Sequence, residues 1–472
     1  MNTVEIDVAV VGAGTAGLAA FHAARKAGAS AVLIEGGEYG TTCARVGCMP
    51  SKLLIAAAEA AHAVGRASEF GVHVDGRVRI DGHAVMARVR RERDRFVGFV
   101  LRDVEDIPEA ERIGGHACFV DDHTLEVDEH TRVTCKSIVI ATGSHAVCPD
   151  SYKSLGDCLI TSDEVFDWDD LPKAVAVIGP GIVGLELGQA LHRLGVRVAV
   201  LGRGGRVGPI SDPEIRACAC ETFNEEFTLA PDARIADVRR YGDRVAIRRA
   251  GKDGSEVVEY FDYVLAATGR VPNVADIGLD RTTLTLDDKS VPSFDPSTTR
   301  TVSVNGASPI FIAGDAGNYI PLLHEAADEG RIAGVNAAHL ARGMPVMPGL
   351  RRAGINVVFT DPQIGVVGGG LRAMKPGTFA TGEVSFEDQG RARILLRNKG
   401  LLKVYGDLAT ARFVGAEMVA PAAEHLAHLL AWALQNGMTV AQMLEMPFYH
   451  PVIEEGVRTA LRDLDANLRT WV

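Results

Sequence analysis

Residues 1–340 alternate short apolar runs with segments of helical periodicity. Four of the runs are Val8–Val11, Ala31–Glu35, Ala174–Ile178 and Arg197–Leu201. Nearly unbroken apolar runs of this length are typical of parallel strands that helices cover on both faces. The pattern therefore predicts an α/β fold.

Further elements lie between and after these runs. Helices are expected over Ile55–Val64 and Ala84–Val104, followed by strands within residues 116–135. Another buried strand is expected over Pro309–Ala313, with a helix from about Leu323 to Leu340.

From about Met347 the pattern changes to antiparallel strands followed by helices near 421–436 and 439–444, which predicts a separate α+β domain. The expected strands are Asn356–Phe359, Ile364–Val367, Ala392–Leu396, Leu401–Tyr405 and Phe413–Val419.

A glycine-rich turn follows the first strand. Gly12, Gly14 and Gly17 lie between Val8–Val11 and a helical segment, and Glu35 ends the next strand. Glycines at this spacing permit a tight turn and let a pyrophosphate approach the helix N-terminus, where unpaired N–H groups favour an anion. Glu35 can accept hydrogen bonds from a ribose diol, so this unit is predicted to bind a dinucleotide.

The same pattern recurs later in the chain. Gly179, Gly181 and Gly184 follow the strand Ala174–Ile178 and introduce a helix expected over Leu185–Leu194. Each unit also ends in an apolar strand followed by Ala-Thr-Gly, at residues 141–143 and 267–269. This internal repeat predicts two bound nucleotides.

The second unit differs from the first where its second strand ends. Gly202 stands in place of the acid, and Arg203 and Arg206 follow. An acid would repel a ribose 2′-phosphate, whereas a guanidinium would bind it, so this site favours NADP over NAD. The alternative is that both arginines are solvated loop charges.

Cys43 and Cys48 are separated by four residues and lie at the start of an expected helix, directly after the first dinucleotide unit. A thiol pair in this place suggests a redox-active disulfide beside a nucleotide cofactor. A zinc site is the alternative, but no second Cys or His pair at ligand spacing lies nearby, and no metal is expected. One cofactor is expected to be a flavin, because a nicotinamide alone does not exchange electrons readily with a disulfide.

Composition narrows the range of partners. The formal net charge of −12 argues against nucleic acid or an anionic membrane as the main partner, since both need a concentrated basic surface. No apolar run reaches the roughly 18 residues of a membrane span, and the start lacks the basic region of a signal peptide. Eight cysteines spread thinly over the chain predict a cytoplasmic protein with one special pair.

In combination, these motifs resemble those of the class I pyridine nucleotide-disulfide oxidoreductases, closest to dihydrolipoyl dehydrogenase. Pro50-Ser51-Lys52, Gly314-Asp315 and His450-Pro451 carry the resemblance beyond the two glycine loops. It covers essentially the whole chain and implies two Rossmann-like domains and a C-terminal α+β dimerisation domain. The implied parts are an FAD-binding domain over 1–150, an NAD(P)-binding domain over 151–273, a central segment over 274–346 that completes the FAD site, and an interface domain over 347–472.

The resemblance also implies catalytic roles. Cys48 would be the thiolate that contacts the flavin, and Cys43 the outer thiol that exchanges with substrate. His450 would be the acid–base catalyst supplied by the opposite subunit of a homodimer, oriented by Glu455, with Glu454 as the competing carboxylate. Taken alone, His450 is better explained as a helix cap with proline at the first helical position.

Lys52 would lie near the flavin N5, paired with Glu186. The residues implied to bind the two cofactors are Gly12, Gly14, Gly17, Glu35, Thr42, Lys52, Ala117, Thr142, Gly143, Ser144, Gly179, Gly181, Gly184, Glu186, Arg203, Gly269, Gly314 and Asp315.

Some positions depart from the family pattern. Thr41 and Thr42 stand where glycines are frequent, and Pro180 lies inside the second glycine loop. The absence of a cysteine pair near the C-terminus argues against a mercuric reductase or a thioredoxin-reductase-type tail. No lipoyl domain precedes the fold, so the chain is expected to be a flavoprotein component only.

Three functions follow. The leading hypothesis is an FAD-dependent dithiol–disulfide oxidoreductase that passes electrons between a small dithiol, free or on a lipoyl-bearing protein, and NAD(P)+. The alternatives are an NADPH-dependent reductase of another small disulfide or quinone, and a non-catalytic flavin-bound subunit.

Overall fold

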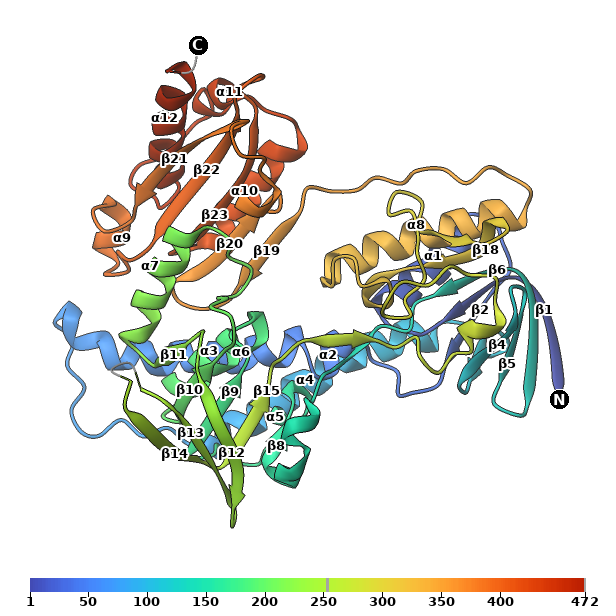
Figure 1. Ribbon diagram of the computed structural model, residues 1–472, viewed down its shortest axis with the longest axis horizontal. Helices are drawn as coiled ribbons and strands as arrows, with labels where there is room; N and C mark the ends of the chain where they lie inside the picture. The colour runs from blue at the N-terminus through green and yellow to red at the C-terminus, as the bar shows by residue number, and fades with distance from the viewer. Residues whose placement is uncertain (252–253, 471–472) are drawn as a thin grey trace. The chain divides into compact units, whose positions relative to one another are not determined.

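The computed structural model describes residues 1–251 and 254–470 (Figure 1). They divide into two compact units that are described separately. Unit 1 comprises residues 1–50, 88–147 and 270–351, and the described residues of unit 2 are 51–87, 148–251, 254–269 and 352–470. The helices α3 (Cys48–Arg66) and α4 (Gly82–Glu105) each contain a boundary between the units.

Unit 1 is built on a sheet in which β1, β2, β3, β6 and β18 run parallel. Its order is β17 (Arg300–Ser303), β18 (Gly306–Ile312), β6 (Thr131–Ile140), β1 (Asn2–Val11), β2 (Ala31–Glu35) and β3 (Arg112–Gly114), and β4 (Ala117–Asp121) and β5 (Thr124–Val127) extend β6 antiparallel. A separate antiparallel pair joins β7 (Ser144–Ala146) to β16 (Arg270–Pro272).

The helices α1 (Thr15–Lys26) and α8 (Leu323–Ala341) lie side by side in unit 1 (Figure 1). Their backbones approach closely because α8 presents glycine to α1. A Cβ atom on Gly330 would lie 2.2 Å from the Ala16 carbonyl oxygen, and one on Gly334 would lie 2.1 Å from that of Ala20. The short helix α2 (Thr42–Arg45) completes the elements of this unit near the cysteines.

Unit 2 contains a second parallel sheet. Its order is β11 (Thr228–Ala230), β10 (Arg197–Leu201), β9 (Ala174–Ile178), β15 (Tyr263–Ala266) and β8 (Leu159–Ile160). The helix α6 (Ile182–Arg193) follows β9, while α5 (Ser162–Val165) and α7 (Pro213–Asn224) follow β8 and β10. An antiparallel sheet of β12 (Ile235–Tyr241), β13 (Arg244–Ala250) and β14 (Glu256–Phe261) is inserted before β15.

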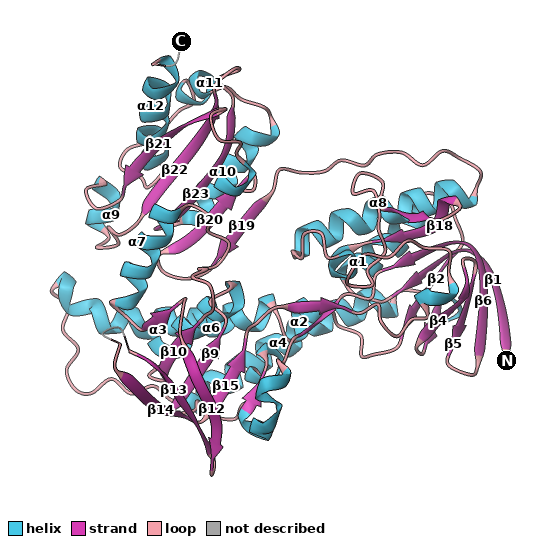
Figure 2. Cartoon of the chain, viewed as in Figure 1, coloured by secondary structure: helices cyan, strands magenta, loops and turns pink. Residues whose placement is uncertain are grey.

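The C-terminal part of unit 2 is an antiparallel sheet flanked by helices (Figure 2). Helix α10 (Ala423–Gln435) packs on β20 and β23, and α12 (Glu455–Arg469) packs on β21 and β22. The strand order is β19 (Ile355–Val358), β20 (Gln363–Val367), β23 (Phe413–Ala420), β22 (Leu401–Asp407) and β21 (Phe379–Ser385); α9 (Gly390–Ile394) and α11 (Val440–Leu444) complete the domain.

The α/β prediction is confirmed, and the strands Ala31–Glu35, Ala174–Ile178 and Arg197–Leu201 have the predicted bounds. The strand expected over Ala392–Leu396 is wrong, because the first three residues belong to helix α9 and the last two form a turn. The Gln389 side chain accepts a hydrogen bond of 2.7 Å from the Ala392 N–H and caps the first turn. This local cap outweighs the β pattern of the apolar run. The strand that completes the sheet is β21, which the sequence pattern did not reveal.

The glycine contact between α1 and α8 makes a stability prediction. Gly334→Ala should destabilise the protein by about 1–3 kcal/mol, because the new methyl group has no space against the Ala20 carbonyl. Gly65→Ala is the matched control, since Gly65 lies in α3 and a Cβ atom there would meet nothing within 4 Å. The control should stabilise by up to about 1 kcal/mol. Thermal unfolding of both variants measures the difference, and equal melting temperatures would contradict the close packing.

Candidate functional site

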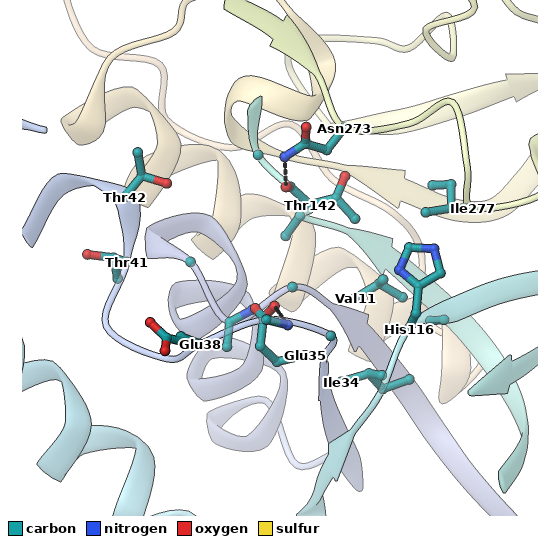
Figure 3. Close-up of a pocket in the computed structure, with 18 of the residues that line it drawn as sticks. Val11, Ile34, Glu35, Glu38, Thr41, Thr42, His116, Thr142, Asn273 and Ile277 are labelled. Carbon is teal, nitrogen blue, oxygen red and sulfur yellow. Dashed lines mark hydrogen bonds between the residues drawn. The ribbon is translucent and has the colours of Figure 1, made fainter. Parts of the chain in front are cut away.

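A cavity of about 370 Å³ opens in unit 1 at the carboxyl ends of β1, β2 and β6 (Figure 3). Ligands of open α/β sheets bind at this edge. Of the predicted cofactor-binding residues, those that line the cavity are Gly12, Gly14, Glu35, Thr42, Ala117, Thr142 and Gly143.

The glycine loop is shaped by contacts that no side chain could make. Gly12 has a φ of +106°, and a Cβ atom there would lie 2.3 Å from the Ala141 carbonyl oxygen. A Cβ on Gly17 would lie 1.8 Å from the Gly12 carbonyl oxygen. A Cβ on Gly14 would meet no atom within 4 Å, which leaves this part of the backbone open to a ligand.

Glu35 ties two loops of the cavity together. Its Oε2 accepts a hydrogen bond of 2.6 Å from the Ala13 N–H, and its Oε1 accepts one of 2.8 Å from the Gly37 N–H. Each carboxylate oxygen keeps a further lone pair, so the acid can still accept from a ribose hydroxyl.

Thr142 provides a test of whether these residues fit a polar cofactor. Its Oγ1 is buried without a hydrogen-bond partner within the described part of the chain, while its carbonyl oxygen accepts from Asn273 Nδ2 at 3.0 Å (Figure 3). An orphaned buried hydroxyl costs about 1–3 kcal/mol. A cavity wall with an unmet hydroxyl, an open glycine loop and an acid that can still accept from a ribose fits FAD.

The predicted residues at the end of β6 and β18 also come together. Asp315 Oδ2 accepts a hydrogen bond of 2.6 Å from Ser144 Oγ. Arg270 donates to the Ser144 hydroxyl and carbonyl at 2.8 and 2.7 Å. Gly314, with a φ of +70°, precedes Asp315 in a short 3₁₀ turn and donates its N–H to Glu329.

Cys43 lies in α2 and Cys48 is the first residue of α3. Both are free thiols, Cys43 half-buried and Cys48 exposed, and their side chains share a hydrogen bond. That hydrogen bond, and then burial, raise the pKa of Cys43 above its usual value. A thiol with a raised pKa needs a base to become the thiolate that exchange requires.

Thr41, two residues before Cys43, adopts a backbone conformation with a positive φ, which favours glycine. It takes a φ of +58°, where a residue with a Cβ atom is strained by about 1–3 kcal/mol. Its hydroxyl accepts a hydrogen bond of 3.3 Å from the Ala44 N–H and caps α2, which offsets part of that strain.

An open cavity of about 450 Å³ lies beside Cys43 in unit 1. Asp103 is the only charged residue that lines it among those the structure describes, and the main apolar lining residues are Leu18, Met49, Phe96, Phe99, Val100 and Leu323. Sequence reasoning missed this cavity. Phe96 and Phe99 belong to the apolar spacing of α4, which does not distinguish a core face from a binding face.

The second glycine loop repeats the construction of the first. Gly179 has a φ of +112°, with its Cβ position 2.2 Å from the Ala267 carbonyl oxygen. A Cβ on Gly184 would lie 1.9 Å from the Gly179 carbonyl oxygen, and one on Gly181 would meet nothing within 4 Å. Gly269, with a φ of +125°, follows β15 as Gly143 follows β6.

Gly202 and Pro180, two separate departures from the family pattern, prove to be in contact. A Cβ atom on Gly202 would lie 2.6 Å from the Pro180 ring and 2.6 Å from the Pro231 carbonyl oxygen. No side chain therefore fits at Gly202. Arg203, the next residue, is exposed, and so is Arg206.

Lys52 lies one helical turn after Cys48 on α3, and within unit 2 it pairs with Glu186 of α6. Lys52 Nζ donates to Glu186 Oε2 at 2.7 Å. The Glu186 side chain is only 4% exposed, and its Oε1 accepts a second hydrogen bond, of 2.9 Å, from the Phe359 N–H.

His450 contacts Glu455, and no contact joins it to Glu454 among the described interactions. His450 Nδ1 lies 3.0 Å from Glu455 Oε2, and the His450 side chain is 80% exposed. Burial acts to raise the pKa of Glu455, but the hydrogen bonds from His450 and Val452 outweigh it and hold the pKa below its usual value. Helix α12 begins at Glu455, so Pro451 is not the first helical residue and the capping interpretation of His450 is wrong.

Residues 1–251 and 254–470 contain neither a metal-binding cluster nor a membrane-spanning helix. No three His, Cys, Asp or Glu side chains gather closely enough to hold a metal ion. No helix is both long and apolar enough to cross a membrane.

The orphaned hydroxyl of Thr142 predicts opposite effects on the empty and loaded protein. Thr142→Val should stabilise the apoprotein by about 1–3 kcal/mol and weaken FAD binding about two- to tenfold, since the ligand loses a hydrogen-bond partner. Ser137→Ala is the control, because the Ser137 hydroxyl is also buried without a partner but does not line the cavity. FAD titration of the apoproteins measures both affinities; an unchanged affinity in Thr142→Val would contradict the fit.

Two family profiles match this chain. Residues 6–330 match the profile of the pyridine nucleotide-disulphide oxidoreductases, and residues 355–461 match that of their dimerisation domain. Dihydrolipoyl dehydrogenase of Chlamydia pneumoniae is 28% identical over 463 residues, which cover 96% of this chain and 95% of the relative. Mercuric reductase of Shigella flexneri is 30% identical over 484 residues, which cover 98% and 82%.

A solved structure shows the same fold. The Cu(II) complex of the HOCl-induced flavoprotein disulfide reductase RclA from Escherichia coli superposes with a TM-score of 0.80 at 20% identity, over 99% of each chain. The chain therefore belongs to the pyridine nucleotide-disulphide oxidoreductase family and is a flavoprotein disulfide oxidoreductase that uses FAD with NAD(P)(H) as electron partner, close to dihydrolipoyl dehydrogenase.

Proposed function

We propose that the chain is a homodimeric dithiol–disulfide oxidoreductase of dihydrolipoyl dehydrogenase type. The observation that carries the proposal is the hydrogen-bonded pair of Cys43 and Cys48, with Cys43 facing an apolar cavity. The dimerisation domain over residues 355–461 supports the homodimer. The predicted division at residues 150, 273 and 346 and a cytoplasmic location are parts of the same proposal.

The chemistry is thiol–disulfide exchange at Cys43. One thiolate of the substrate attacks Cys43 Sγ of the disulfide and displaces Cys48 as a thiolate. The second substrate thiolate attacks the mixed disulfide, which releases a cyclic disulfide and Cys43 thiolate. His450 of the opposite subunit, oriented by Glu455, takes one substrate proton, and the released Cys43 thiolate, whose pKa is raised, takes the other. FAD, when bound, would supply the two-electron link from Cys48 to NAD(P)+.

The remaining predicted residues hold the cofactors in this proposal. The glycine loop and Glu35 bind the adenosine diphosphate part of FAD, Asp315 accepts from its polyol chain, and Lys52 lies near the flavin N5. The second glycine loop holds the pyridine nucleotide, as the resemblance implies.

The cavity beside Cys43 favours a small apolar dithiol as substrate. Among the residues that the structure describes, its lining offers Asp103 but no cation to a carboxylate, which disfavours a polyanionic disulfide such as glutathione disulfide. A lipoamide-like dithiol, with an aliphatic body, suits the side chains of Phe96, Phe99 and Val100. A lipoyl-bearing protein is the proposed physiological donor.

Replacement of the outer thiol tests this function. Cys43→Ser should abolish dihydrolipoamide turnover, because no mixed disulfide can form, while NAD(P)H still reduces the flavin. Cys220→Ser, in α7, is the matched control and should retain turnover. Steady-state assays and anaerobic flavin spectra measure both properties. Lipoamide turnover that survives in Cys43→Ser would refute the proposal, and a wild-type protein that binds FAD but turns over nothing would favour the non-catalytic subunit.

A second candidate is an NADPH-driven reductase of another small disulfide or a quinone. Two residues favour this candidate. Gly202 has no space for an acidic side chain, which would repel a 2′-phosphate, and the exposed Arg203 offers a guanidinium that could bind one. The direction of electron flow then reverses, while the cysteine pair keeps its role.

Coenzyme preference tests the role of Arg203. Arg203→Glu should lower the ratio of NADPH to NADH reduction rates by at least about tenfold, since a charge-assisted contact to the 2′-phosphate is replaced by repulsion. Arg239→Glu changes the same charge on exposed β12 and should leave the ratio unchanged. Anaerobic stopped-flow reduction by each coenzyme gives the ratio. If Arg203→Glu behaves like the control, the arginine is only a solvated loop charge.

A further inference from the structure

Phe359 contacts both members of the Lys52–Glu186 ion pair. Its backbone N–H donates to Glu186 Oε1 at 2.9 Å, and the centroid of its ring lies 4.7 Å from Lys52 Nζ. All three residues belong to unit 2, but they come from α3, from α6 and from the segment after β19. A single residue thus joins the cation and the carboxylate.

The two contacts stabilise different members of the ion pair, the hydrogen bond Glu186 and the ring Lys52. Glu186 is 4% exposed, and a buried carboxylate needs a hydrogen-bond donor besides its cation. The Phe359 N–H supplies it. Lys52 is 34% exposed on a flexible four-carbon stem, and the electron-rich face of the ring attracts its ammonium group. The ring therefore restrains the more mobile partner.

Side chains on one face of α6 hold the backbone next to Phe359 in place. Gln189, one turn after Glu186, donates to the Asp361 carbonyl at 2.8 Å and accepts from the Asp361 N–H at 2.7 Å. Arg193 adds a contact of 3.3 Å to Asp361 Oδ2. Three positions on one face of α6 thus fix the backbone from Phe359 to Asp361.

We propose that Phe359 is a positioning residue, which holds the Lys52 ammonium against Glu186 and thereby fixes a positive charge for the flavin. The second half rests on the proposed function, in which Lys52 lies near the flavin N5. A fixed ammonium there favours the electron-rich reduced flavin. Neither the sequence motifs nor the family resemblance singled out Phe359.

The test replaces the ring and keeps the rest of the residue. Phe359→Leu retains the N–H and the apolar bulk but removes the cation–π contact. Acetylation of Lys52, followed by mass spectrometry, should become about threefold faster, and the ratio of reduced to oxidised flavin at a fixed potential should fall about threefold. Phe359→Tyr should behave like the wild type. Phe386→Leu, in the fully buried core of the same unit, should change stability and neither readout.

A double-mutant cycle with Lys52→Met isolates the route of the effect. Phe359→Leu should not change the flavin ratio further once Lys52 is replaced. An unchanged acetylation rate in Phe359→Leu, or a flavin effect that persists in the Lys52→Met background, would overturn the proposal. If acetylation accelerates but Lys52→Met leaves the flavin ratio unchanged, Phe359 still positions Lys52, and the proposed placement of Lys52 beside the flavin fails instead.

Discussion

The two proposed nucleotide sites depend on how closely each glycine loop approaches the neighbouring strand. Gly12 lies against the carbonyl of Ala141, and Gly179 lies against that of Ala267, at distances that exclude any Cβ atom. The same contact thus occurs in both units, although the rest of each site differs. It brings a helix N-terminus to the end of the adjacent strand, and the third glycine of each loop permits the helix to turn away at once. The cavity walls follow from this geometry.

The two units surround their reactive and charged side chains differently, with an apolar cavity beside Cys43 in unit 1 and an ion pair at Lys52 in unit 2. Cys43 faces an apolar cavity and shares a hydrogen bond with Cys48, which keeps its proton on the sulfur. Lys52 and Glu186 instead form an ion pair whose carboxylate is buried and has its own backbone donor. The first arrangement suits a thiol that waits for a base, and the second suits a charge that must stay in place while electrons move.

Much of this could be predicted from sequence, because the signals are local. Buried parallel strands, glycine loops and a cysteine pair each occupy a few neighbouring residues. The spacing of those residues is enough to predict the local backbone conformation. Other features depend on partners far along the chain. Phe359 meets Lys52 although much of the chain separates them, and Phe96 and Phe99 line a cavity only because Cys43 and Leu323 lie opposite. The strand prediction for Ala392–Leu396 was wrong for the opposite reason. A local helix cap from Gln389, within one turn, outweighed the apolar run.

The contact between Gly202 and Pro180 limits which residues the second glycine loop can accept at its strand end. In a glycine loop of the first kind, one substitution at the strand end suffices to exchange an acid for a neutral residue. Here the Pro231 carbonyl blocks the position as firmly as the Pro180 ring does, so removing the proline alone would not reopen it. An acidic side chain therefore does not fit at Gly202, and any charge offered to a coenzyme at this strand end must come from a neighbouring residue such as the exposed Arg203.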